Sequence, residues 1–306
     1  MAIGRGDNSR NSSADVRARG ELIGLLDRYS EALVARDPAL LQFSPRVRFT
    51  ENGQRLALGE GLWDTASGVS LPRYVEFADP VAGQVGFFGV VEERGAPCIL
   101  AVRMKVVKRL VTQLETLVVR KREILFNPTA METRSSILSD ALPVGRRARG
   151  EFVAGANRYF DGIEQDNGGI IQVHPQCLRT ENGVQTVLAS DRDFASSTAS
   201  QGFNLFSLGV ADQIDTGFFE YIPRIRDRRF PIVDLANGLL LAMVVFDQPG
   251  KLTTVNVKGH GRVTLPPLFQ TPTSVLIAEL FRIEDGQIRG IEAVLDFMPY
   301  GITPGW

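Results

Sequence analysis

The sequence repeats itself. Residues 19–53 and 149–183 align without a gap at an offset of 130, and 11 of the 35 aligned positions are identical. The identities include a closing Thr-Glu-Asn-Gly, at 50–53 and again at 180–183. Self-similarity of this extent indicates a structural unit that is used more than once. The sequence therefore predicts two related domains in tandem.

The spacing between matching segments predicts the domain boundaries. The offset grows from 130 to 155 and then to 177 along the chain, so the second copy contains two insertions. Each domain is long enough to bury a core of its own. The polar segment at residues 1–14 is expected to be disordered. The predicted organisation is a first domain at 15–125, a linker at 126–147 and a second domain at 148–306, with inserts near 190–217 and 248–272.

Each copy is predicted to begin with a helix. Apolar residues recur at helical spacing through residues 16–36, and Tyr29 lies on the apolar stripe. Tyr159 holds the same place in the second copy. A short second helix is predicted to follow the first one and to end at Pro45.

Strands are predicted after the helices. Asn-Gly pairs follow Glu51 and Glu181, and this dipeptide favours tight turns with positive φ. Residues 83–122 contain three long apolar segments separated by turn residues, and Asp285-Gly286 predicts a hairpin in the second copy. Helices followed by strands indicate an α+β fold, in which helices pack on one face of a curved antiparallel sheet.

Composition excludes several functional classes. The net charge is -1, so neither nucleic acid nor a membrane is an expected partner. Two cysteines and two histidines form no metal-ligand pattern, and no Gly-rich phosphate loop occurs. We therefore expect no metal and no cofactor. The polar amino-terminal segment lacks the apolar core of a secretory signal, which favours a cytoplasmic location.

The order of elements and two motifs resemble the nuclear transport factor 2-like (SnoaL-like) superfamily. The motifs are LLDRYSEALVARDPALLQFSPRVRFTENG and the closing FRIEDGQIRGIEAVL. The resemblance covers nearly the whole chain as two cone-shaped domains, each with helices and a sheet around an apolar pocket. Because this superfamily includes dehydratases, isomerases, cyclases, hydrolases and non-enzymatic binders, it implies a fold more than a function.

The resemblance also suggests catalytic residues. Similarity to the ketosteroid isomerases of this superfamily places Tyr29 and Tyr159 at the position of a catalytic tyrosine. Glu51 and Glu181 fall near the position of the general base, where those isomerases have Asp. The second, protonated acid of those enzymes has no assigned counterpart here. The alternative for the glutamates is a shared turn, and for the tyrosines a place in the core.

Residues that differ between the copies are further candidates, because duplication alone does not explain them. His174 replaces Ser44 of the first copy, and His260 lies in the second insert; either could transfer protons, cap a backbone group or face solvent. The predicted catalytic set is Tyr29, Glu51, His174, Tyr159 and Glu181. The predicted substrate-binding set is Trp63, Asn52, Lys105, Arg282 and His260, for which packing or solvation is the alternative.

Together these features predict a cofactor-independent lyase acting on a bulky apolar or aromatic small molecule. By family resemblance alone, the chain is similar to the double-size sphingomonad diarylpropane lyases, which remove formaldehyde from a lignin-derived diaryl diol to leave a stilbene. The alternatives are a dehydratase, isomerase or cyclase on a steroid-like or polyketide-like compound, and a non-catalytic binding or dimerisation module. Association into homo-oligomers stays open.

Overall fold

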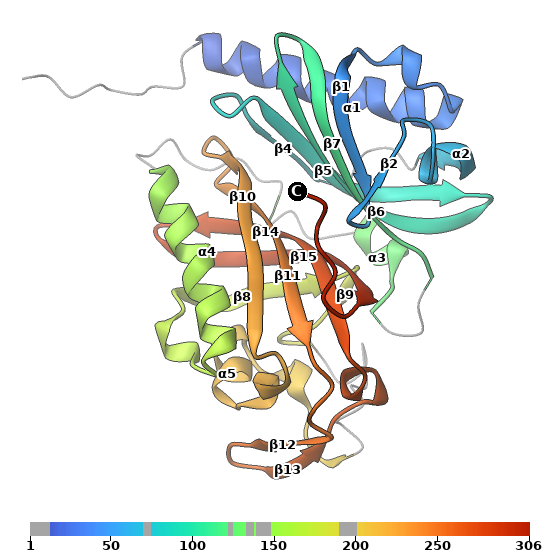
Figure 1. Cartoon of the computed structure of the whole chain (residues 1–306). Coiled ribbons are helices and arrows are strands. Elements are labelled where there is room, and N and C mark those ends of the chain that lie inside the picture. Colours follow the sequence, from blue (N-terminus) through green and yellow to red (C-terminus); the bar gives the residue numbers. More distant parts are fainter. Residues whose placement is uncertain (1–12, 70–74, 122–124, 133–137, 139–147, 190–200) are drawn as a thin grey trace, which may run out of the picture.

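The computed structural model describes residues 13–69, 75–121, 125–132, 138, 148–189 and 201–306 (Figure 1). Most of the predicted disordered segment at 1–14, most of the predicted linker at 126–147 and the first part of the insert near 190–217 lie outside these residues. Across the described ranges, no helix has both the length and the apolar character that crossing a bilayer requires.

The first half packs a long helix against a seven-stranded sheet. The order of the sheet is β2-β1-β7-β6-β5-β3, and β4 also pairs with β5. The apolar face of this helix, which includes Leu26 and Tyr29, is buried in the core, as the predicted stripe requires. The elements are α1 (Ser13–Ala35), η1 (Pro38–Leu40), β1 (Phe43–Glu51), β2 (Gln54–Leu56), α2 (Leu62–Thr65), β3 (Ala66–Val69), β4 (Val75–Asp79), β5 (Gln84–Glu93), β6 (Ala96–Val107), β7 (Leu110–Val119) and α3 (Pro128–Glu132).

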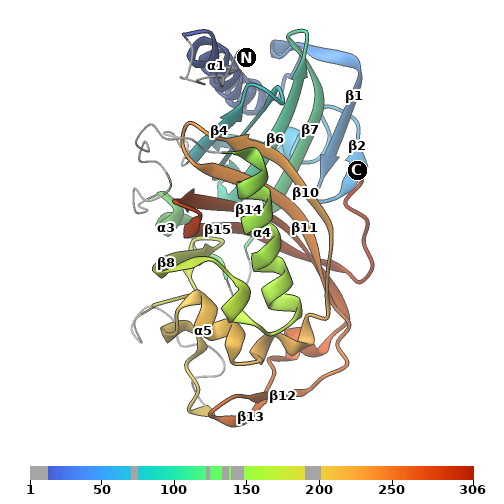
Figure 2. The same cartoon turned by 90° about the vertical axis from the view of Figure 1, so that its left-hand side faces the viewer.

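The second half repeats this plan with a six-stranded sheet of order β10-β11-β14-β15-β8-β9. Figure 2 shows α4 lying across the outer face of this sheet. The inserted segments add short helices and the separate hairpin β12–β13. The elements are α4 (Arg149–Glu164), η3 (Gly168–Ile170), β8 (Val173–Glu181), β9 (Val184–Gln185), η5 (Leu205–Ser207), α5 (Val210–Asp215), η6 (Phe218–Tyr221), β10 (Arg224–Asp234), β11 (Leu239–Gln248), β12 (Thr254–Val257), β13 (Gly261–Thr264), η7 (Pro267–Gln270), β14 (Thr273–Glu284) and β15 (Gln287–Pro299).

The two sheets share their strand order and their register. Residues that are equivalent at offsets of 130 or 177 in the sequence are also paired in the same way across the strands. Phe49 lies opposite Leu114 as Arg179 lies opposite Ile291, and Val102 lies opposite Thr116 as Glu279 lies opposite Ala293. This correspondence supports an internal duplication, which stays a prediction.

The Thr-Glu-Asn-Gly turn has the same structural role in both halves. Asn52 and Asn182 have φ values of 48° and 47°, as the Asn-Gly pairs predict. The Asn52 side chain accepts the Val118 N–H at 2.7 Å and donates to the Val118 carbonyl at 2.9 Å. The Asn182 side chain bridges Leu295 in the same way, with both distances at 2.9 Å. The asparagine therefore ties each turn to the neighbouring long strand.

The halves meet sheet to sheet, with a third apolar core between them. Asp79 at the end of β4 and Asp234 at the end of β10 each accept a backbone N–H of the other half, at 3.0 and 3.1 Å. Arg149 of α4 pairs with Asp79, and Arg19 of α1 pairs with Asp234 at 2.9 Å. These contacts are reciprocal, like those of a two-fold symmetric dimer.

The expected purely antiparallel sheet is wrong in one respect. β1 pairs with β7 in parallel, and β8 pairs with β15 in parallel. All the other strand pairs in the described sheets are antiparallel. The last long strand of each sheet, β7 or β15, pairs with the first strand, β1 or β8, although several strands lie between them in the sequence. Whether the pair is parallel or antiparallel therefore depends on the number of those intervening strands. Local sequence patterns do not contain that information.

The short helix predicted before Pro45 is also wrong. Only the 3₁₀ turn Pro38–Leu40 forms, and the Asp37 carboxylate caps it by accepting the Ala39 N–H at 2.9 Å. β1 begins at Phe43 and continues through Pro45. Its register shifts between Phe43 and Arg48, which accommodates a proline that cannot donate to the sheet.

Candidate active site

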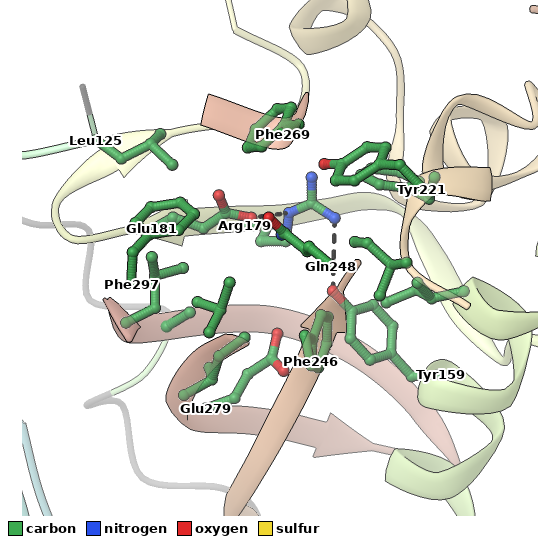
Figure 3. Close-up of a pocket in the computed structure, with 17 residues that line it drawn as sticks. Leu125, Tyr159, Arg179, Glu181, Tyr221, Phe246, Gln248, Phe269, Glu279 and Phe297 are labelled. Carbon is green, nitrogen blue, oxygen red and sulfur yellow. Dashed lines mark hydrogen bonds and ion pairs between the residues drawn. The ribbon is translucent and has the colours of Figure 1, made fainter. Parts of the chain in front are cut away.

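The second half encloses a cavity of about 90 Å³. It lies between the sheet, the carboxyl-terminal part of α4 and the two short helices η6 and η7 (Figure 3). Both of these short helices follow or belong to the predicted inserts. The lining is mostly apolar, with a small number of polar side chains, as is typical of small-molecule sites. The polar lining residues are Tyr159, Arg179, Glu181, Tyr221, Gln248 and Glu279.

Arg179 connects the polar groups of the cavity. Its position on β8 places it two residues before Glu181 on the same face of the strand. The buried guanidinium pairs with Glu181 at 3.2 Å and donates to the Tyr159 hydroxyl at 3.4 Å. It also donates to Thr186 at 3.0 Å and to Gln213 at 2.5 Å. These contacts hold the guanidinium in place and compensate its charge in an apolar environment.

Glu279 projects into the cavity from the middle of β14 (Figure 3). The residue is only 3% exposed, and its Oε2 has no hydrogen-bond partner among the described residues. Burial raises the pKa of its carboxyl group to about 8, with Glu181 adding to the rise and Arg179 and a hydrogen bond to Tyr159 opposing it. At neutral pH this carboxyl group is therefore mostly protonated and can donate a proton.

The Tyr159 hydroxyl lies between Arg179 and Glu279. Burial raises the pKa of this phenol well above its usual range, so it stays neutral at physiological pH. Its oxygen accepts from Arg179, and its hydroxyl group is also hydrogen-bonded to Glu279, so Tyr159 connects the guanidinium to the acid. Tyr221 forms another wall, and its ring stacks on Phe269 with centroids 4.6 Å apart. The cavity thus combines a neutral acid, a carboxylate and a phenol donor within apolar walls.

Apolar side chains occupy the equivalent space in the first half. Phe49 and Val102 stand where the second half has Arg179 and Glu279. Tyr29 packs edge-on against Trp63, with ring centroids 5.5 Å apart, and also contacts Phe87. The first half therefore lacks the acid and the guanidinium of the second, and its equivalent tyrosine is part of a packed core.

Of the predicted catalytic residues, the structure brings Tyr159 and Glu181 together at the cavity. Glu51 instead accepts the Leu62 N–H at 2.8 Å and pairs with Arg120 at 3.4 Å, which is a local structural role. Tyr29 lies in the first core, away from that cavity.

The remaining catalytic candidate, His174, lies at the start of β8. Its Nδ1 accepts the Gln176 N–H at 3.2 Å. His260 is exposed between β12 and β13, where its ring packs on Phe203 and its Nε2 lies 3.2 Å from the carbonyl oxygen of Gln201. Neither histidine lines the cavity.

The other predicted substrate-binding residues also lie outside the cavity. Trp63 is 1% exposed and fills the first core, and the Asn52 amide bonds to backbone. Lys105 is partly buried on β6, while Arg282 is buried on β14 and pairs with Glu284 at 3.0 Å. Within the described residues, no group of three or more His, Cys, Asp and Glu side chains is arranged as metal ligands would be.

Sequence reasoning missed the two most informative residues, Arg179 and Glu279. Both differ from their counterparts in the first copy, where the aligned residues are Phe49 and Val102. A buried charge that replaces an apolar residue in one copy is the signal that could have identified them.

A family model described as "Domain of unknown function (DUF8021)" matches residues 145–295, just under half of the chain. This range contains every residue of the cavity lining except Leu125 and Phe297, and therefore all of its polar groups. No curated protein matches the chain.

Several solved structures are similar to parts of the chain. A protein described as a SnoaL-like polyketide cyclase from Jannaschia sp. CCS1 is 15% identical, with a TM-score of 0.27, and covers 50% of this chain and 92% of that one. An LEH-like epoxide hydrolase from M. tuberculosis is 8% identical, with a TM-score of 0.26 and coverages of 48% and 84%. An isomerase described from Rhodopseudomonas palustris is 14% identical, with a TM-score of 0.23 and coverages of 46% and 89%. These scores are too low to support an argument about function.

The strand order and the helix on each sheet are consistent with the nuclear transport factor 2-like fold that the sequence motifs suggested. The case for function depends on the cavity itself.

Proposed function

We propose that the second half is a cofactor-independent lyase that eliminates a hydroxyl group from a small, mostly apolar alcohol. The observation that carries this proposal is Glu279, a buried carboxyl group with a raised pKa and with an oxygen that has no partner in the described part of the chain. It lies in the same cavity as the ion-paired carboxylate Glu181. Acid–base catalysis needs two groups of this kind in opposite protonation states.

The reaction divides between the two carboxyl groups. Glu279 donates its proton to the hydroxyl oxygen of the substrate, and the C–O bond breaks as water leaves. Glu181 removes a proton from the neighbouring carbon, and the electrons of that C–H bond form the new double bond. The hydrogen bond from Tyr159 stabilises the Glu279 carboxylate that forms as the proton leaves. Transfer of a proton from Glu181 to Glu279 restores the starting state, so the net products are an alkene and water.

Loss of formaldehyde from a diaryl diol is the more specific version of this proposal. Glu279 would again assist departure of a hydroxyl group, while Glu181 would deprotonate the terminal alcohol so that a C–C bond breaks. The cavity of about 90 Å³ is smaller than the ~150 Å³ cavity that holds benzene in an engineered protein. A whole diaryl molecule is larger than such a space, so the cavity volume counts against this version and favours a substrate with no more than one ring.

The direct test is turnover without added metal or nucleotide. The purified protein is incubated with single-ring secondary alcohols and with a diaryl diol, while alkene absorbance, product mass and formaldehyde are measured. We expect loss of water from a single-ring alcohol, and Glu279→Gln should reduce the rate by roughly 10²-fold or more. The residue aligned with Glu279 in the first half is Val102, so the control is Glu51→Gln, the same substitution at a buried glutamate of the first half.

The assay also separates the alternatives. An isomerase or cyclase would give a product of unchanged mass. A non-catalytic binding module would retain the ligand without converting it. Equal rates in the wild type and in Glu279→Gln would contradict the proposed role of this residue.

A further inference from the structure

We infer that the cavity selects an uncharged, single-ring ligand that carries one hydroxyl group. This inference deepens the proposed function and rests on it for the reaction, although the binding preference can be measured separately. Three features of the cavity support it: the balance of charge, the shape of the walls and the position of the unpartnered oxygen.

The ionised groups of the cavity already compensate each other. Arg179 pairs with Glu181 at 3.2 Å, while Glu279 contributes no charge at neutral pH. A ligand anion would meet the Glu181 carboxylate, and a ligand cation would meet the Arg179 guanidinium. Either charge would be buried without a counter-charge of its own, which is costly in an apolar site. The cavity therefore favours a neutral molecule.

Aromatic side chains define the shape of the site. The rings of Phe219, Phe246, Phe269 and Phe297 line the cavity together with Tyr221. The Tyr221 and Phe269 rings are inclined by only 13° at 4.6 Å, so this pair forms a closed wall and not a slot for a third ring. Flat apolar walls suit a planar apolar group, and a volume of about 90 Å³ limits that group to no more than one ring.

Among the polar atoms of the described lining, the Glu279 Oε2 stands out because it has no hydrogen-bond partner. Glu279 is almost completely buried, and its Oε2 has no partner among the described residues. The Tyr159 hydroxyl lies beside it and is hydrogen-bonded to Arg179 and to Glu279. A buried polar atom without a partner is costly unless a ligand or water completes it. One ligand hydroxyl group can complete this oxygen, either by accepting its proton or by donating to it.

The test uses three ligands of similar size: benzyl alcohol, benzoate and benzylamine. Their binding to the wild-type protein at pH 7 is measured by calorimetry. We expect benzyl alcohol to bind roughly tenfold or more tightly than either charged analogue. Equal or tighter binding of benzoate or benzylamine, or no binding of any of the three, would overturn the inference.

A variant provides a second, independent readout. Glu181→Gln removes the carboxylate and leaves Arg179 with an uncompensated charge, so the preference should shift towards benzoate. Glu51→Gln makes the same change in the first half and should leave all three affinities unchanged. An unchanged preference in Glu181→Gln would contradict the charge argument. Binding of benzyl alcohol without turnover of any alcohol would overturn the proposed lyase and keep this inference.

Discussion

Replacing Glu279 by Gln is expected to stabilise the protein while it abolishes most of its activity. The pKa of this carboxyl group rises from 4.5 to about 8 on folding, chiefly because of burial. Between these two pH values the folded protein binds one proton more than the unfolded chain does. The free energy of unfolding therefore decreases as the pH increases through this window. A glutamine has no proton to bind and escapes this loss.

The magnitude follows from the width of the window. Each pH unit is worth about 1.4 kcal/mol, so the wild type loses roughly 3 kcal/mol between pH 4.5 and pH 7. Arg179, Glu181 and Tyr159 are the titratable groups that act on this carboxyl group, and their effects are included in its pKa. The advantage of Glu279→Gln should therefore be close to zero at pH 4.5 and should grow to roughly 3 kcal/mol at pH 7.

Urea unfolding of the wild type and the variant at several pH values measures this difference. Glu51→Gln serves as the control, since Glu51 is a buried glutamate of the first half that accepts a backbone N–H and pairs with Arg120. The reasoning is refuted if the stability difference between wild type and Glu279→Gln does not change between pH 4.5 and pH 7. A difference that grows with pH for Glu51→Gln as well would show that the effect is not specific to the cavity.

Three further predictions test the division of roles between the halves. Tyr159→Phe should lower kcat by roughly 10²-fold in steady-state assays, because it removes the hydrogen-bond donor to the Glu279 carboxyl group. Tyr29→Phe should leave kcat unchanged, and similar losses in both variants would contradict the assignment of the site to the second half. Trp63→Ala should open a cavity in the first core and cost roughly 3–5 kcal/mol in urea unfolding; a small effect on stability would show that this core is loosely packed. Asp79→Ala removes the partner of Arg149 and of a backbone N–H in the other half, so the free energy of unfolding should fall by roughly 3 kcal/mol. The two halves should then unfold in separate urea transitions, and an unchanged single transition would refute the importance of this contact.

Much of the fold could be predicted from local patterns. The apolar stripe around Tyr29 and Tyr159 placed both rings in the interior, because helical periodicity reports which face is buried. The Asn-Gly pairs after Glu51 and Glu181 gave turns with positive φ for a backbone reason that needs no tertiary contact. Strand pairs of the two halves have the same register at the offsets found in the sequence, because a shift of one residue would turn the apolar side chains of a strand away from the core.

The site was less predictable, because its residues come together only through strand pairing. Arg179 and Glu279 lie 100 positions apart, and no local pattern relates them. Glu51 and Glu181 are both the glutamate of a Thr-Glu-Asn-Gly turn, yet Glu51 accepts a backbone N–H and pairs with the half-exposed Arg120, whereas Glu181 pairs with the buried Arg179. The two glutamates differ in role because their partners, such as Leu62 and Arg120 in the first half, lie outside the repeated motif. Identity between the copies therefore indicates the shared fold, while differences between them indicate the site.

A crystal structure of the protein soaked with an uncharged single-ring alcohol tests the central claim most directly. The account predicts one bound molecule in the second half, with its hydroxyl group within hydrogen-bond distance of Glu279 and Tyr159. It also predicts no ligand around Tyr29 and Trp63 in the first half. Density beside Trp63, or a ligand whose hydroxyl group points away from Glu279, would contradict the account.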